Sequence, residues 1–306
     1  MAKPTFDPGL TTQYTGILRR SINKDGSFNV ERRGTGWRDI HPYLHLISMP
    51  WPSFLVLVFV AYLAVNTIFA TLYYSLGPGS LLNGDNPHKL DHFLNAFFFS
   101  AHTLTTVGYG NIAPSSVPAN IIAVIEALVG LLGFALATGI LFGRFSRPSA
   151  RIGFSQHALV APYEDRTSLQ FRIVNRRPNA LMELEATVIF MAVEGEPGKQ
   201  KRVFRALSLE RDSIDFLALT WTVVHPIDES SPMFGQTPDD MARQQAEIIV
   251  VIKAFDETFA QNVLSRYSYR YDEFVWNAKF TPAFDFDTTG TMVLNIDKVG
   301  NYAAIV

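Results

Sequence analysis

Five consecutive residues have the composition to hold a dehydrated cation. Residues 106–110 read Thr-Val-Gly-Tyr-Gly. A cation stripped of water needs a cage of oxygens, and successive backbone carbonyls aimed at one axis provide one. Gly108 and Gly110 lack a Cβ and can take the positive-φ conformations that this alignment requires. Thr106 can add its hydroxyl oxygen at the inner end, while Val107 and Tyr109 would point away from the axis and brace the ring.

One copy of this loop supplies only part of such a cage, so a fourfold assembly of identical chains is implied. The alternative is a plain Gly-Tyr-Gly turn in a β-protein, and the flanking segments decide between the two. Residues 93–105 form an apolar run that is too short to cross a bilayer, which predicts a re-entrant helix. Its C-terminal end leads into Thr106, so the negative end of the helix dipole would face the cation.

Two long apolar segments flank this run. Residues 53–74 contain no charged residue and are long enough to cross ~30 Å of hydrocarbon. Residues 119–143 form the second predicted span, whose one ionisable residue is Glu126. A carboxylate at membrane depth is costly and must face protein or water. One face of this span, predicted to line either the pore or the subunit contacts, carries Glu126, Gly130, Phe134, Thr138 and Phe142.

Two features of the second span could control opening. Gly130 and Gly139 are candidate hinges, and the alternative is that these small residues allow close helix packing. Phe142 lies two helical steps beyond Phe134, at the cytoplasmic end. Rings from several copies meeting on one axis would leave an apolar neck that sheds water and stops ions, so Phe142 is the candidate gate. The alternative is a Phe that faces lipid or a neighbouring subunit.

Basic residues flank the spans on their outer sequence sides. The loop between the spans holds only Lys89 among lysines and arginines. The positive-inside rule therefore predicts a multi-pass protein of the cell's inner, or plasma, membrane with both termini in the cytoplasm. Basic residues at this depth attract anionic lipid headgroups, and the alternative is that they only set topology. The candidate lipid-binding residues are Arg38, Arg144, Arg147 and Arg151.

Composition bounds the rest of the chain. With 306 residues and a net charge of −2, it has room for about two domains and shows no nucleic-acid footprint. The absence of Cys excludes disulfides and thiolate metal sites. The predicted organisation is a basic cytoplasmic tail over 1–36, of which one short piece could add a strand to a sheet. An interfacial helix over 37–50, a transmembrane pore domain over 51–148 and a cytoplasmic domain over 149–306 follow it. An ordinary surface helix is the alternative for 37–50.

The last domain reads as all-β. Short strands predicted over 169–174, 186–193, 215–224 and 247–255, with one helix over 239–246, indicate an antiparallel, immunoglobulin-like β-sandwich. No GxGxxG motif and no catalytic constellation occur, so the chain is not predicted to be an enzyme. His225 has acids nearby and could bind metal or act in catalysis, but a hydrogen-bonded loop anchor is favoured.

The order of these elements resembles the inwardly rectifying potassium channel family, in particular its prokaryotic branch. TVGYG is the established filter signature of potassium channels, and the carbonyl cage is their established mechanism. The other matching stretches are 37–39, 51–52, 96–100, 144–148, 175–177, 225–235 and 256–258. The resemblance implies a homotetramer with K⁺ ions in the filter and no other cofactor. It also implies regulation by anionic phosphoinositides and block by polyamines or Mg²⁺.

Family positions also carry expectations for single residues. Phe142 falls on the family's helix-bundle constriction, and Glu183 on an acid of the cytoplasmic vestibule. Phe134 stands where strong rectifiers carry an acid, so weak rectification is expected. His102 stands where eukaryotic members carry a Glu, and Asn111 replaces that acid's Arg partner.

Two other functions remain open from the sequence. One is a cation pore gated by an unrelated soluble ligand domain. The other is a membrane-anchored β-sandwich used for binding or adhesion, which predicts a single span and gives TVGYG no use. Ion flux from liposomes separates these functions.

Overall fold

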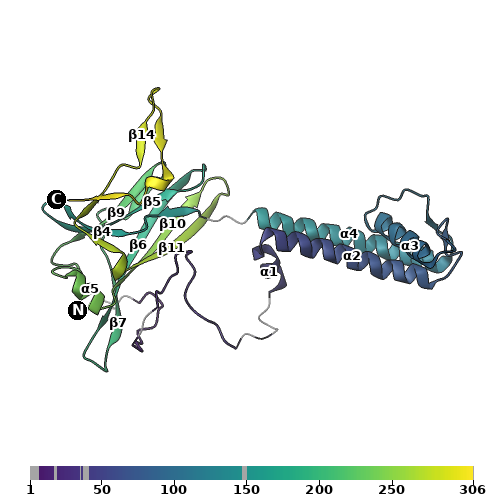
Figure 1. Ribbon diagram of the computed structural model, residues 1–306, viewed down its shortest axis with the longest axis horizontal. Coiled ribbons are helices and arrows are strands. Elements are labelled where there is room, and N and C mark those ends of the chain that lie inside the picture. The colour runs from purple at the N-terminus through teal and green to yellow at the C-terminus, as the bar shows by residue number, and fades with distance from the viewer. Residues whose placement is uncertain (1–6, 17–18, 35, 37–40, 147–149, 306) are drawn as a thin grey trace. The chain divides into compact units, whose positions relative to one another are not determined.

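The structure is a computed structural model that describes residues 7–16, 19–34, 36, 41–146 and 150–305. The chain divides into two compact units, one of Arg33–Arg147 and one of Met1–Arg32 with Pro148–Val306. The first is helical and the second is built on β-strands (Figure 1). Two of the candidate lipid-binding residues, Arg38 and Arg147, lie outside the described residues.

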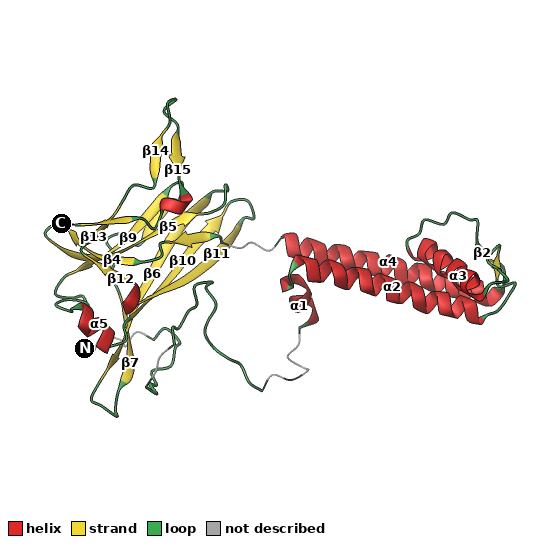
Figure 2. Ribbon diagram, viewed as in Figure 1, coloured by secondary structure: helices red, strands yellow, loops and turns green. Residues whose placement is uncertain are grey.

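The described part of the helical unit is built from α-helices, drawn red in Figure 2. They are α1 (Pro42–Ser48), α2 (Trp51–Ser75), α3 (Lys89–Leu104) and α4 (Val117–Phe145). Among the described residues, α2 and α4 alone are long and apolar enough to cross a membrane. They contain the spans predicted over 53–74 and 119–143. Proline at the first turn suits both helices, because the missing N–H is one that a helix start leaves unpaired.

The loop between α2 and α3 is tied to the segment after the filter residues. β1 (Leu81–Leu82) pairs antiparallel with β2 (Ala113–Pro114). Ser115 extends this pairing, because its N–H donates to Ser80 O and its hydroxyl to Gly79 O. No strand was predicted in this part of the sequence. The two-residue strands are too short to give a periodic signal.

α1 begins at Pro42, so the described part of the predicted interfacial helix is shorter than 37–50. It packs on the C-terminal end of α4. A Cβ at Gly143 would come within 2.5 Å of the Tyr43 hydroxyl, so a larger residue there would displace the Tyr43 side chain. Leu44 and Tyr43 are exposed on α1.

The β unit contains two five-stranded sheets, which confirms the predicted all-β fold. One sheet has the order β11-β10-β6-β7 with β8 on β6, and the other has β12-β4-β5-β3 with β9 on β5. All pairs in the two sheets are antiparallel except β12 with β4. The bounds are β3 (Ile152–Phe154), β4 (Ala158–Tyr163), β5 (Arg166–Asn175), β6 (Leu181–Glu194), β7 (Lys201–Ala206), β8 (Ser213–Phe216), β9 (Thr220–Ile227), β10 (Glu247–Asp256), β11 (Gln261–Arg270) and β12 (Phe274–Trp276).

Both sheets contribute to one apolar core. Phe171 and Ile173 of β5 and Leu184 and Phe190 of β6 are fully buried in it. These residues alternate along their strands, because successive side chains of a strand point to opposite faces of the sheet. The strand predicted over 215–224 is wrong in one respect, because a break after Phe216 divides it into β8 and β9.

Smaller elements complete this unit. They are the helix α5 (Pro238–Arg243), the pair β13 (Ala278–Phe280) with β16 (Tyr302–Ala304), the hairpin β14 (Phe284–Phe286) with β15 (Met292–Leu294), and the 3₁₀ turns η2 (Tyr271–Glu273) and η3 (Ile296–Lys298).

The N-terminal segment also packs here. Ile22 is 1% exposed, and the backbone N–H and hydroxyl of Ser21 both donate to the buried carboxylate of Glu247.

Candidate functional site

The backbone after α3 takes unusual conformations. Gly108 has φ +57° and Gly110 has φ +81°, the positive values expected of these glycines. Thr106 also has a positive φ, of +59°. A β-branched residue rarely adopts this conformation, and such strain costs of order 1–3 kcal/mol and gathers at functional sites. The sequence did not predict the positive φ of Thr106, because threonine is a residue type that rarely adopts it.

Hydrogen bonds to the end of α3 fix the direction of these peptide units. The N–H groups of Val107 and Gly108 both donate to His102 O, at 2.9 and 3.2 Å. In a trans peptide the carbonyl points opposite to the N–H of the same unit. The carbonyl oxygens of Thr106 and Val107 are therefore directed away from α3. Two successive oxygens facing the same way are what a cation cage requires.

The side chains of this loop have few partners within the chain. Val107 is 52% and Tyr109 is 74% exposed. The ring of Tyr109 meets the imidazole of His102 edge-on, with centroids 4.8 Å apart. His102 thus contacts the loop twice, through its carbonyl and through its ring.

α4 packs against the C-terminal end of α3. A Cβ at Gly130 would overlap the carbonyl oxygen of Leu104, so this glycine allows the two helices to meet. The geometry favours close packing as the role of Gly130. A Cβ at Gly139 would contact nothing within 4 Å. α4 is continuous through both glycines, and their role as hinges stays a prediction.

Glu126 is fully buried and joins three helices. Its carboxylate receives the Tyr73 hydroxyl of α2 at 2.7 Å and contacts the Ser100 hydroxyl of α3. Glu126 and Ser100 are both 0% exposed. The acid therefore faces protein, on the side of α4 that α3 covers.

Farther along α4 the same helical face is uncovered in the single chain. Phe134 is 74% and Phe142 is 73% exposed, and Thr138 between them is also exposed. These residues follow Gly130 at steps of four, so they continue the face on which α3 sits. On a membrane-spanning helix, an apolar face of this kind can face lipid, a neighbouring subunit or a pore.

Arg144 has partners inside the helical unit. Its guanidinium donates to Leu46 O and, at 2.6 Å, to Met49 O at the C-terminal end of α1. It also lies over the rings of Trp51 and Phe54, at 4.6 and 4.5 Å. A cation suits the carbonyls that end a helix. Of the other candidate lipid-binding residues, Arg151 is described and is exposed.

Two further candidates lie in the β unit. His225 is buried, and its ring nitrogens lie 2.6 Å from Ser208 O and 2.7 Å from the Ser231 hydroxyl. Burial lowers the pKa of His225 below its usual value. These contacts match the loop anchor.

Glu183 is exposed with φ +49°, where a register shift marks a bulge in the pairing of β6 with β10.

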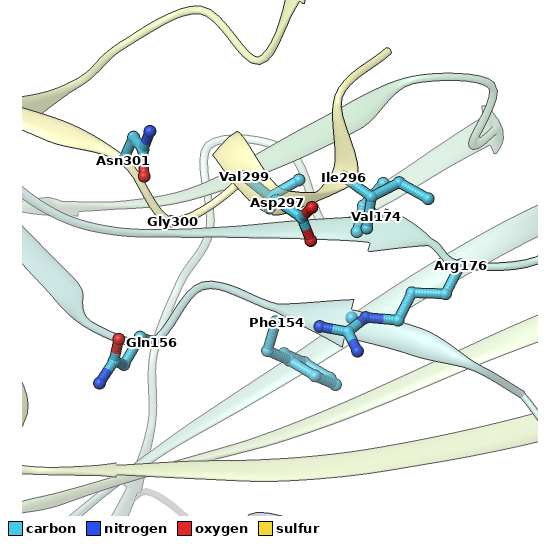
Figure 3. A pocket seen from close by; sticks show the side chains of 10 residues that line it. Phe154, Gln156, Val174, Arg176, Ile296, Asp297, Val299, Gly300 and Asn301 are labelled. Atoms are coloured by element: carbon cyan, nitrogen blue, oxygen red, sulfur yellow. The ribbon is translucent and has the colours of Figure 1, made fainter.

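A pocket of about 220 Å³ opens beside β3 and η3 (Figure 3). Its charged lining residues are Arg176 and Asp297, and both are exposed. No group of three or more His, Asp or Glu residues placed to hold a metal occurs in the described part of the chain.

Comparisons with known proteins cover both units. The family model described as the inward rectifier potassium channel C-terminal domain matches residues 152–305, and the one described as an ion channel matches residues 56–147. The inward rectifier potassium channel Kirbac3.1 of Paramagnetospirillum magnetotacticum is 35% identical over 91% of this chain and 94% of its own length. The G protein-activated inward rectifier potassium channel 3 of Mus musculus is 28% identical over 86% and 72%.

Proposed function

The chain belongs to the inward rectifier potassium channel family, and from that premise we propose that residues 106–110 select K⁺ in a homotetrameric pore. It is an ion channel and not an enzyme. The observation that carries the proposal is the shared direction of the Thr106 and Val107 carbonyls, set by their peptide N–H groups on His102 O. Four such loops around one axis would replace the hydration shell of K⁺. The filter then holds K⁺ ions, and no other cofactor is needed.

The exposed face of α4 supports the fourfold arrangement. In this proposal the pore below the filter is lined by Phe134, Thr138 and Phe142. Their exposed side chains then surround a shared axis. α2 and α4 cross the plasma membrane, and the basic segments that flank them put both termini in the cytoplasm. The β unit then forms the cytoplasmic domain, with Glu183 in its vestibule.

Anionic lipids are proposed to regulate this pore. Basic residues flank both spans on the cytoplasmic side: Arg38 precedes the first span, and Arg147 and Arg151 follow the second. Each basic residue there contributes about 1 kcal/mol of attraction to an anionic leaflet. Arg144 contributes differently, because its guanidinium is held by α1 and α2. A headgroup bound beside it would act on the same junction.

Uptake of Rb⁺ into liposomes tests both proposals. Liposomes that contain the purified protein should take up Rb⁺, and Ba²⁺ should block this uptake. Na⁺ should not be taken up in place of the larger ion. Adding phosphoinositide should change the rate, and the paired Arg147→Gln, Arg151→Gln variant should lose that response while its basal uptake persists. The absence of Ba²⁺-sensitive uptake from a tetrameric sample would reject the channel assignment. An unchanged lipid response in the variant would reject the lipid site.

Phe142 is proposed as the gate. Four rings at the cytoplasmic end of α4 form an apolar neck that excludes water. Phe142→Ala should therefore raise basal Rb⁺ uptake severalfold. Phe145→Ala is the matched control, because Phe145 packs on Trp51 at 5.1 Å and not on the proposed axis. Equal or lower uptake in a tetrameric Phe142→Ala sample would contradict the gate.

A further inference from the structure

A chain of polar side chains is sealed inside the helical unit. Asn66, Ser100 and Glu126 are 0% exposed and Tyr73 is 1% exposed. They come from α2, α3 and α4, and they lie behind the helix that carries the filter. Buried polar groups away from water must satisfy one another, so the donors and acceptors can be counted.

The count of donors and acceptors depends on which acceptor receives the hydroxyl proton of Ser100. The Ser100 oxygen contacts a Glu126 carboxylate oxygen and lies 3.1 Å from Asn66 Oδ1. The Asn66 amide nitrogen donates to Tyr62 O at 2.7 Å, so its oxygen is the atom turned to Ser100. The Ser100 oxygen also lies 3.3 Å from the backbone oxygen of Asn66. Ser100 therefore faces three acceptors and can donate to only one of them.

An ionised Glu126 leaves this group unsatisfied. Ser100 would donate to the carboxylate, and Asn66 Oδ1 would be buried without a donor. An unpaired buried acceptor costs about 1–3 kcal/mol, and a charge at membrane depth adds its own penalty. A neutral acid removes both costs, because Glu126 then donates to Ser100, Ser100 donates to Asn66, and Tyr73 donates to the other Glu126 oxygen.

We propose that Glu126 carries a proton and is a positioning residue for the filter, the first donor of a hydrogen-bond chain that fixes α3 between α2 and α4. Ser100 stands two residues before His102, whose carbonyl holds the N–H groups of Val107 and Gly108. The chain therefore sets where that carbonyl lies. The part that concerns ion selection rests on the proposed function, whereas the bound proton does not.

Infrared spectroscopy detects the proton without any ion flux. The difference spectrum between wild type and Glu126→Gln in lipid at neutral pH should contain the carbonyl band of a protonated carboxylic acid, shifted by exchange into D₂O. A carboxylate band in its place overturns the proposal, whether or not the protein conducts.

Flux measurements then test the positioning role. Glu126→Gln should keep K⁺ uptake within about twofold, because its amide donates to Ser100 and accepts from Tyr73 as the neutral acid does. Ser100→Ala breaks the chain at its centre and should lower uptake about tenfold and reduce K⁺ over Na⁺ selectivity. The control is Thr67→Val, since that exposed α2 hydroxyl bonds only to Leu63 O among the described contacts, and uptake should be unchanged.

Two results would overturn this role. One is a tetrameric Glu126→Gln protein that loses uptake as completely as Glu126→Ala, because the site would then need the negative charge. The other is a folded Ser100→Ala protein with the uptake and selectivity of wild type.

Discussion

Gly108→Ala is expected to abolish potassium-selective flux. Gly108 has φ +57°, where an L-residue with a Cβ is disfavoured by roughly 1–2 kcal/mol. Within one chain the added Cβ would meet nothing within 4 Å, so the strain lies in the backbone and not in a collision. Four copies would multiply it at one axis. Relief of that strain turns the Val107–Gly108 peptide and removes its carbonyl from the cage.

Single-channel recordings in planar bilayers measure this effect as the K⁺ to Na⁺ permeability ratio. Gly133→Ala is the matched control, because Gly133 lies inside α4, its φ is not positive, and a Cβ there would also meet nothing within 4 Å. That variant should conduct normally and gain stability of about 0.5–1 kcal/mol. A tetrameric Gly108→Ala channel with wild-type selectivity would show that residues 106–110 are not the filter.

Phe134→Asp is expected to convert a weak rectifier into a strong one. Strong block needs a polyamine or Mg²⁺ held below the filter by negative charge. Phe134 offers none, and Glu126 is buried between α2 and α3 within the single chain. Glu183 lies on an exposed bulge, where salt screens charge over ~8 Å. Up to four carboxylates in the narrower pore would attract a polyvalent cation far more strongly.

Current against voltage with internal spermine measures the change. The spermine concentration for half block at positive voltage should fall by more than about tenfold in Phe134→Asp. Phe134→Asn separates charge from loss of the ring and should rectify as weakly as wild type. Steep block in the wild type, or equal block in the Asp and Asn variants, would contradict the role given to the charge.

The transmembrane half of the fold was predictable because its signals are strong and local. An apolar run as long as 53–74 without a single charge is typical of a membrane span, and glycines in a TVGYG string point to positive φ. The positive φ of Thr106 and the approach of Gly130 to Leu104 were not predictable, because each depends on a segment distant in sequence or on strain.

The β unit shows the same limit. The break between β8 and β9 escaped detection because Leu217, which lies in it, is 5% exposed and continues the apolar pattern of a strand. The sequence predicted lipid binding for Arg144 from its charge and depth, and this role stays a prediction. The carbonyls of Leu46 and Met49 that receive its guanidinium could not be predicted, because they are distant in sequence. Residue type gave the chemistry of each site, and tertiary contacts decided how that chemistry is used.

The Arg144 contacts hold three helix ends of the helical unit together. One guanidinium fastens the end of α1 to α4 and lies on two rings of α2, so the three helix ends form a braced joint rather than a flexible elbow. Phe142 is two residues away on the same helix turn. A displacement of α1 would therefore be transmitted directly to the end of α4 that carries Phe142.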